Sequence, residues 1–140
     1  MKIKQIPPEI ISGKTYFADE EGNIINSKGK KLKPGFSPAK TKRHLGSGKL
    51  YPLVNIAGKS RTIHFLVCSA FWGVRKPDHV CHHLDGNGLN NRPDNLIWVL
   101  RKNHPIFDRA TRAGHIFVHD PRTTDEIMLF EMQHPYLFDN

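Results

Sequence analysis

Residues 79–104 read HVCHHLDGNGLNNRPDNLIWVLRKNH, and the prediction of the fold rests mainly on this segment. Its apolar ends, residues 79–83 and 95–100, are predicted to be strands. Residues 84–94 between them are rich in Gly, Asn, Asp and Pro, which let the chain turn back on itself. A helix is expected from about Asn103 to Ala113, closed by Gly114. The segment therefore predicts a strand–loop–strand–helix unit.

Four residues of this unit have the side chains that phosphodiester hydrolysis requires: His82, His83, Asn95 and His104. Successive strand residues face opposite ways, so the two neighbouring imidazoles cannot do the same work in the same direction. A twisted strand end still allows one to hold a metal ion while the other faces a substrate. A neutral imidazole suits the activation of water, and a divalent ion suits the neutralisation of charge on the leaving oxygen.

The run from His82 to Val99 closely resembles the signature of HNH endonucleases, which are common in phages and mobile introns. Similarity to the same family extends over roughly residues 14–110, through residues 16–24, 31–34 and 64–71. The resemblance implies an α+β fold with a ββα-metal core. It also implies a β-rich basic region and a short helix before that core. The activity it implies is metal-dependent cleavage of DNA.

The resemblance also implies a role for each matched residue. His83 would be the general base, and His82 and His104 would hold one divalent cation. Asn95 would brace the loop and orient His83 through backbone hydrogen bonds. Two imidazoles favour Mn²⁺, Ni²⁺ or Zn²⁺, and Mg²⁺ at cellular abundance can also serve.

The sequence departs from the family pattern at Leu100 and Pro105. Proline is tolerated only in the first turn of a helix, so His104 is expected at the helix opening and Asn103 becomes a rival ligand. These departures motivate the alternative that the protein binds nucleic acid without cutting it. A structural zinc site that includes Cys81 is a further alternative, although zinc sites of that type need two paired knuckles.

The charge distribution indicates a polyanionic partner. The formal net charge is +8, and residues 22–77 contain twelve Lys and Arg but no Asp or Glu. Double-stranded DNA is the expected partner, since an uncompensated basic segment attracts phosphates. The alternatives are a merely soluble basic surface and, for Arg92, a solvated loop position. The predicted nucleic-acid contacts are Lys28, Lys30, Lys31, Lys33, Lys40, Lys42, Arg43, Lys59, Arg61 and Arg92.

The remaining elements are predicted from local patterns. Residues 1–13 are expected to form an extended arm, followed by short strands near 15–18 and 24–25 and a loop over 28–48. A hairpin is expected over 50–63, with Pro52 placing its first strand at a sheet edge, and a helix over 64–72 that stops at Gly73.

Three regions follow from this pattern: a basic β-rich region (1–63), the nuclease core (64–114) and a tail (115–140). The tail is expected to form a hairpin, although Thr123 and Glu126 could instead open a helix. His115 to Val118, with Phe130, faintly resembles a DNA-binding module that is appended to homing endonucleases.

The cysteines and the remaining histidines are expected to have structural roles, and the sequence shows no sign of a membrane or secreted protein. Cys68 and Cys81 are expected to be buried free thiols, and His64 and His79 to be surface or capping residues. No apolar run approaches the roughly 18 residues needed to span a membrane, and the start of the chain lacks a secretory signal. These two absences predict an intracellular protein, and the resemblance to HNH endonucleases implies a monomer in the cytoplasm of a bacterial or phage-infected cell.

Overall fold

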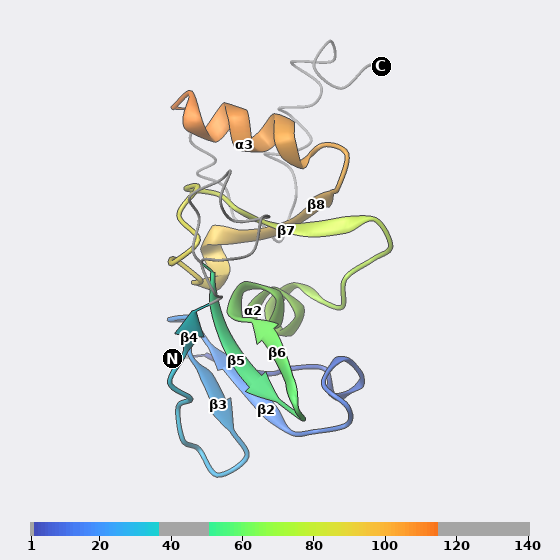
Figure 1. Cartoon of the computed structure of the whole chain (residues 1–140), viewed down its shortest axis with the longest axis vertical. Coiled ribbons are helices and arrows are strands. Elements are labelled where there is room, and N and C mark those ends of the chain that lie inside the picture. Colours follow the sequence, from blue (N-terminus) through green and yellow to red (C-terminus); the bar gives the residue numbers. More distant parts are fainter. Residues whose placement is uncertain (1, 37–50, 115–140) are drawn as a thin grey trace.

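The computed structural model describes residues 2–36 and 51–114 of the chain. Within these ranges the chain forms three small antiparallel sheets, two α-helices and two short 3-10 helices (Figure 1). The predicted mixed α and β fold is confirmed. The predicted hairpin of the tail, and the predicted contacts Lys40, Lys42 and Arg43, lie outside the described residues.

The first sheet has the strand order β1-β2-β3, with β1 at Ile3–Gln5, β2 at Tyr16–Asp19 and β3 at Ile24–Asn26. Strands β2 and β3 agree with the two strands predicted here. The arm is extended only in β1, which pairs with β2, and it then forms the 3-10 helix η1 (Pro8–Ile10). Proline favours the first turn of a helix because it lacks the N–H that would be unpaired there.

The second sheet has the order β4-β5-β6, with β4 at Gly35–Phe36, β5 at Pro52–Ile56 and β6 at Lys59–Thr62. The predicted hairpin corresponds to β5 and β6. The placement of Pro52 on an edge strand is wrong, because β5 is the central strand of this sheet. Pro52 is instead the first residue of β5, a position that tolerates proline, and lies opposite Phe36.

Helix α2 (Ile63–Trp72) packs against both of these sheets and against β8, and it ends at Gly73 as predicted. Gly73 has a φ of 92°, which favours glycine. The main apolar core surrounds this helix. Its buried members are Ile6, Ile11, Ala18, Ile24, Val54, Ile56, Ile63, Leu66, Val67, Cys68 and Leu96.

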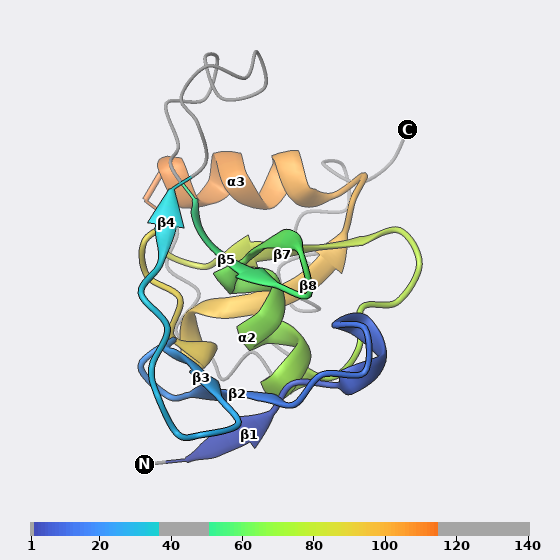
Figure 2. The same ribbon diagram turned by 60° about the horizontal axis from the view of Figure 1, so that its bottom comes forward.

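The predicted strand–loop–strand–helix unit is present. It consists of β7 (His79–His83), the 3-10 helix η2 (Pro93–Asn95), β8 (Leu96–Leu100) and α3 (His104–Arg112). In Figures 1 and 2, α3 lies on one side of the β7–β8 ribbon and α2 lies on the other. A second, smaller apolar core between the ribbon and α3 consists of Leu84, Ile97, Val99 and Phe107.

Two boundaries of this unit differ slightly from the prediction. Asn95 closes η2, so β8 begins one residue later. Helix α3 begins at His104, which follows the capping residue Asn103, so Pro105 falls in the first turn where proline is tolerated. Among residues 2–36 and 51–114, no helix is both long and apolar enough to cross a bilayer.

Candidate nuclease site

The β7–β8 ribbon separates the two neighbouring histidines. Strand β7 pairs His82 with Ile97 and His83 with Leu96, so the two imidazoles leave opposite faces of the ribbon. The ring centroid of His82 lies 5.2 Å from that of His104 on α3. The ring centroid of His83 lies 4.9 Å from that of His64 at the start of α2. Each histidine therefore belongs to its own cluster.

The cluster around His82 has the donor set of a divalent-metal site. His82, His104 and Asp108 each offer one ligand atom, and these atoms all lie within 4.8 Å of one another. His104 and Asp108 are four residues apart on α3 and therefore share a helix face. Two imidazoles and one carboxylate suit Mn²⁺, Ni²⁺ or Zn²⁺. The arrangement fits the single cation that the sequence predicts.

The surroundings of this cluster hold its side chains in place. His82 is 1% exposed and packs on Phe107, with ring centroids 6.3 Å apart. Thr111 Oγ1 lies 3.5 Å from His82 Nε2 and donates a hydrogen bond to the Leu84 carbonyl at 3.4 Å. Asp108 also forms an ion pair with Arg112, in which Arg112 Nη2 donates a hydrogen bond to Asp108 Oδ2 at 2.6 Å. His82 is therefore buried and held in place, whereas His104 and Asp108 are half-buried.

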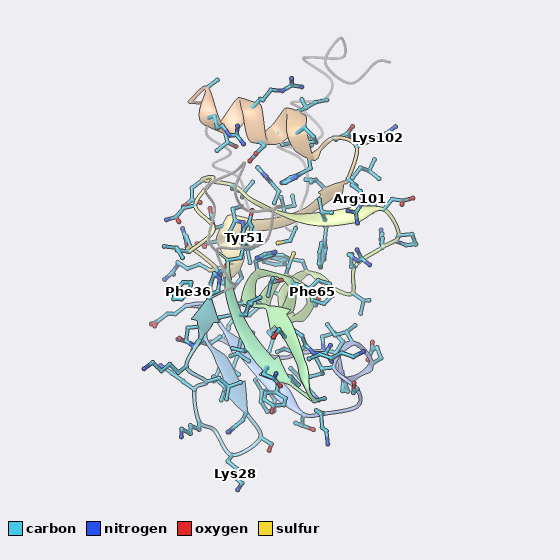
Figure 3. All side chains as sticks on the ribbon, in the orientation of Figure 1. Lys28, Phe36, Tyr51, Phe65, Arg101 and Lys102 are labelled. Carbon is cyan, nitrogen blue, oxygen red and sulfur yellow. The ribbon has the colours of Figure 1, made fainter. Side chains whose placement is uncertain are left out.

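The cluster around His83 is aromatic. Tyr51, the residue before β5, stacks on His83 with centroids 6.0 Å apart and planes 23° apart. His64 meets both rings edge-on. His83 Nε2 lies 2.9 Å from Asn91 Oδ1 in a buried hydrogen bond. Figure 3 shows Tyr51 close to the β7–β8 ribbon.

Electrostatic effects indicate that the two clusters adjoin. Burial lowers the pKa of His64, and together with the charges of His83 and His104 it brings that pKa to about 3. Burial raises the pKa of the Tyr51 hydroxyl, and the negative charge of Asp108 adds to this effect. His64 and Tyr51 therefore respond to residues of the His82 cluster although they contact His83.

The loop between β7 and β8 is organised by Asp85 and Asn95. Asn95 Nδ2 donates to Asp85 Oδ1 at 2.8 Å and to the Asn90 carbonyl at 2.9 Å, and the Asp85 N–H donates to Asn95 Oδ1. Burial raises the pKa of Asp85, but hydrogen bonds from Asn90, Asn87 and Asn95 outweigh this and lower it overall.

This geometry places Asn95 as a brace of the loop. Its carbonyl accepts the Leu84 N–H at 2.8 Å, immediately after His83. A side-chain hydrogen bond to the His83 ring comes instead from Asn91, which the sequence reasoning did not single out. The rival ligand Asn103 is buried at the start of α3.

The predicted nucleic-acid contacts fall into two groups, exposed side chains and one side chain that binds the protein's own backbone. The exposed members of the described set are Lys28, Lys30, Lys31, Lys33, Lys59 and Arg92. Figure 3 shows Lys28 at the end of the molecule opposite α3. Arg92 Nε lies 3.7 Å from Asp94 Oδ1. Arg61 differs from these, because its guanidinium donates to the backbone carbonyls of Ile10 and Ile56 and thereby ties β6 to η1.

Besides Asn91, three further site residues were missed by the sequence reasoning. Asp108 could have been found from its spacing of four residues after His104 on one helix. His64 was expected at the surface or in a cap, but its Nδ1 is buried with no hydrogen-bond partner among the described residues. Tyr51 gave no local signal, because only the tertiary fold brings it to His83.

The cysteines do not extend the metal cluster. Both are free thiols; Cys68 is buried, as predicted, and Cys81 is half-buried. Burial raises the pKa of the Cys68 thiol, and the neighbouring Cys81 adds to the shift. Cys81 Sγ donates to the His64 carbonyl at 3.7 Å, on the α2 side of the ribbon.

Comparisons with known proteins agree with the fold. Residues 61–105 match the family model described as HNH endonuclease, which confirms the resemblance for that segment. The chain is also similar to the structure described as "DNA binding and cleavage by the HNH homing endonuclease I-HmuI". That match has 24% identity and a TM-score of 0.53 over 94% of this chain and 68% of that chain, and it shows a shared fold. No curated protein sequence matches this chain.

Proposed function

We propose that the protein is a metal-dependent endonuclease that hydrolyses phosphodiester bonds in double-stranded DNA. In this proposal His83 is the general base, and one divalent cation is held by His82 and His104, with Asp108 as a third ligand. The observation that carries the proposal is the pair of adjoining clusters on the β7–β8 ribbon, one with metal-binding donors and one around a buried, oriented imidazole. Both are built largely from the segment that matches the family model.

The residues divide the chemistry between them. When bound, a divalent cation supplies Lewis-acid neutralisation of the charge that develops on the phosphate and on the leaving oxygen. His83 removes the proton from the attacking water, and the stacked Tyr51 ring and the edge of His64 limit the positions that the His83 ring can take. The four exposed lysines between 28 and 33 contribute contacts to DNA phosphates. We propose that the protein acts as a monomer.

Cleavage of supercoiled plasmid tests this function. The protein is incubated with Mg²⁺, Mn²⁺, Ni²⁺ or Zn²⁺, or with EDTA. We expect cleavage with at least one of these ions and none with EDTA. His83→Ala should lower the rate by about 10²–10⁴-fold, the usual contribution of a general base, and should leave DNA binding unchanged. His79→Ala on the same strand is the matched control and should cleave at the parental rate.

Two results would contradict the proposal in different ways. If His83→Ala cleaves the plasmid as fast as the parent, His83 is not the base. If the parent shows salt-sensitive DNA binding but no cleavage with any of the four ions, the protein is a nucleic-acid-binding protein that has kept the fold without the chemistry. The first-turn position of Pro105 removes one of the two departures that motivated this alternative.

A further inference from the structure

The hydrogen bond between His83 and Asn91 determines which imidazole nitrogen carries the proton. His83 Nε2 lies 2.9 Å from Asn91 Oδ1, and both residues are buried, at 7% and 6% exposure. A carboxamide oxygen can only accept a hydrogen bond, so Nε2 is the donor. A neutral imidazole with its proton on Nε2 carries its basic lone pair on Nδ1.

We propose that Asn91 is a positioning residue for His83, that it selects the tautomer with the base at Nδ1, and that the turn around Gly22 holds Asn91 in place. This inference rests on the proposed function, because it assigns a partner to the proposed general base. Asn91 acts through His83 and has no contact with the reacting atoms in this scheme.

The turn at residues 19–23, between β2 and β3, packs closely against the backbone of Asn91. Gly22 has a φ of +84°, and a Cβ atom built on it would lie 2.6 Å from the Asn91 carbonyl oxygen. The turn itself is rigid, because the buried Asp19 carboxylate accepts hydrogen bonds from the N–H groups of Glu21 and Asn23. Only a residue without a side chain allows this close approach.

The loop is held from its other side by Asn95. The Asn95 side chain donates to the carbonyl of Asn90, the residue before Asn91. Asn91 therefore lies between an anchor in its own loop and a turn from the amino-terminal sheet. This arrangement fixes the position of its side-chain oxygen at His83 Nε2.

Substitution of Asn91 tests the inference directly. In single-turnover cleavage with saturating protein, Asn91→Ala should lower the rate by about 10²-fold, the effect expected when a reacting group is misplaced by about 1 Å. DNA affinity should not change, because Asn91 is buried. Asn91→Asp should restore most of the rate, because a carboxylate oxygen accepts the same hydrogen bond. Parental cleavage by Asn91→Ala would overturn the inference.

A double variant separates positioning from a general loss of structure. If Asn91 acts through His83, adding Asn91→Ala to His83→Ala should produce no further loss of the residual cleavage. A further loss as large as that of Asn91→Ala alone would show that Asn91 acts independently of His83, and would overturn the inference.

The chain offers a closely matched control for Gly22. Gly29 also has a φ of +84°, in a turn where Asn26 Oδ1 accepts from the N–H groups of Lys28 and Lys30 as Asp19 does in the first turn. A Cβ atom on Gly29 would meet no described atom within 4 Å. Gly22→Ala and Gly29→Ala should therefore add similar backbone strain, but only Gly22→Ala should slow single-turnover cleavage. Equal cleavage rates in the two variants would exclude the role of the Gly22 turn.

Nitrogen NMR of the histidine side chains keeps the inference separate from the proposed function. In the metal-free protein, His83 should show the signature of the Nε2–H tautomer, assigned by its loss in His83→Ala. Asn91→Ala should convert this signal to a mixture of tautomers, and Asn91→Asp should retain it. An unchanged His83 signal in Asn91→Ala would overturn the inference even if the parent cleaves DNA. If the parent cleaves nothing, the proposed function fails, and this spectrum still decides the role of Asn91.

Discussion

His82 and His83 are neighbours in the sequence but serve different clusters, because successive side chains of a strand point to opposite faces. This division requires a separate set of partners for each imidazole. The partners of His82 are His104 and Asp108 on α3, and the partners of His83 are Asn91, Tyr51 and His64. Two adjacent residues can thus supply both a metal ligand and a base.

Asp108 should contribute to metal affinity. Asp108→Asn keeps the size of the side chain but removes the negative charge that attracts a cation. Loss of a residue that only supports a metal ligand weakens metal binding by about 10–100-fold, or about 1–3 kcal/mol. Because Asp108 is proposed as a ligand itself, we expect its loss to weaken Mn²⁺ binding, measured by calorimetry, by at least this much. Asp94→Asn is the matched control, because Asp94 is 73% exposed in its side chain and lies outside the cluster. Equal weakening in both variants would contradict the assignment of Asp108.

His64 should make the folded protein less stable in acid. Its folded pKa of about 3 lies below the ordinary value of 6.5, so the unfolded chain binds a proton that the folded one resists. The contribution of neutral His64 is complete above pH 6.5 and is lost as the pH falls toward 3. His64→Phe keeps a ring against Tyr51 and His83 but cannot be protonated. Urea unfolding at about pH 7 and about pH 4.5 should show a smaller loss of stability in His64→Phe than in the parent. Parallel losses in both proteins would contradict this expectation.

Helix α3 supplies two of the three proposed metal ligands, and its attachment to the ribbon depends mainly on one residue. Phe107 is 1% exposed and packs with Leu84, Ile97 and Val99. It lies between His104 and Asp108 in the sequence, so the apolar contact and the ligands belong to the same two turns. The small core therefore fixes the distance between α3 and His82.

Truncation of Phe107 should destabilise the protein and weaken metal binding together. Phe107→Ala removes a buried ring and leaves a cavity, so we expect the free energy of unfolding to fall by about 3–5 kcal/mol. Phe107→Leu should cost less than about 1.5 kcal/mol, because it keeps most of the apolar volume. Urea unfolding and Mn²⁺ calorimetry on both variants measure the two effects. Parental stability in Phe107→Ala would show that this core does not hold the helix.

The molecule as a whole combines a basic amino-terminal region with a nuclease-like unit, and α2 joins them. Helix α2 packs against the sheets of the amino-terminal region and against β8 of the unit. The turn around Gly22 makes a second connection, at Asn91. In the proposed function, contacts of the amino-terminal region with DNA would therefore position a phosphate relative to the ribbon.

DNA affinity should depend on salt through the exposed lysines of this region. Each phosphate contact that is lost reduces the slope of log affinity against log salt by about 0.9, so Lys31→Gln with Lys33→Gln should reduce it by about 1.8. Lys2→Gln with Lys4→Gln removes the same charge at and just before β1 and is the matched control. Fluorescence anisotropy with duplex DNA over a range of salt concentrations measures both slopes. The same slope change in both double variants would show a diffuse charge effect in place of a defined contact.

Local patterns in the sequence were sufficient for most elements. Alternating or continuous apolar runs identified β2, β3, β5, β6, β7 and β8, and glycine and proline correctly marked the end of α2 and the start of α3. These features depend on backbone preferences within a few residues, which a sequence expresses directly. The spacing of His82, His83, Asn95 and His104 likewise reflects a single local unit, and residues 61–105 match the HNH endonuclease model.

Tertiary structure alone determined the partners of these residues. Pro52 lies in a central strand because β4 adds to the sheet, and Arg61 binds backbone carbonyls because β6 passes beside η1. Asn91, Tyr51 and His64 meet at His83 from a loop, a strand end and a helix start that are distant in sequence. Such contacts depend on how elements pack together, and no local preference encodes packing between distant segments. The sequence by itself therefore predicted the candidate reactive groups except Asp108, and the packing of distant elements against the β7–β8 ribbon decided what orients them.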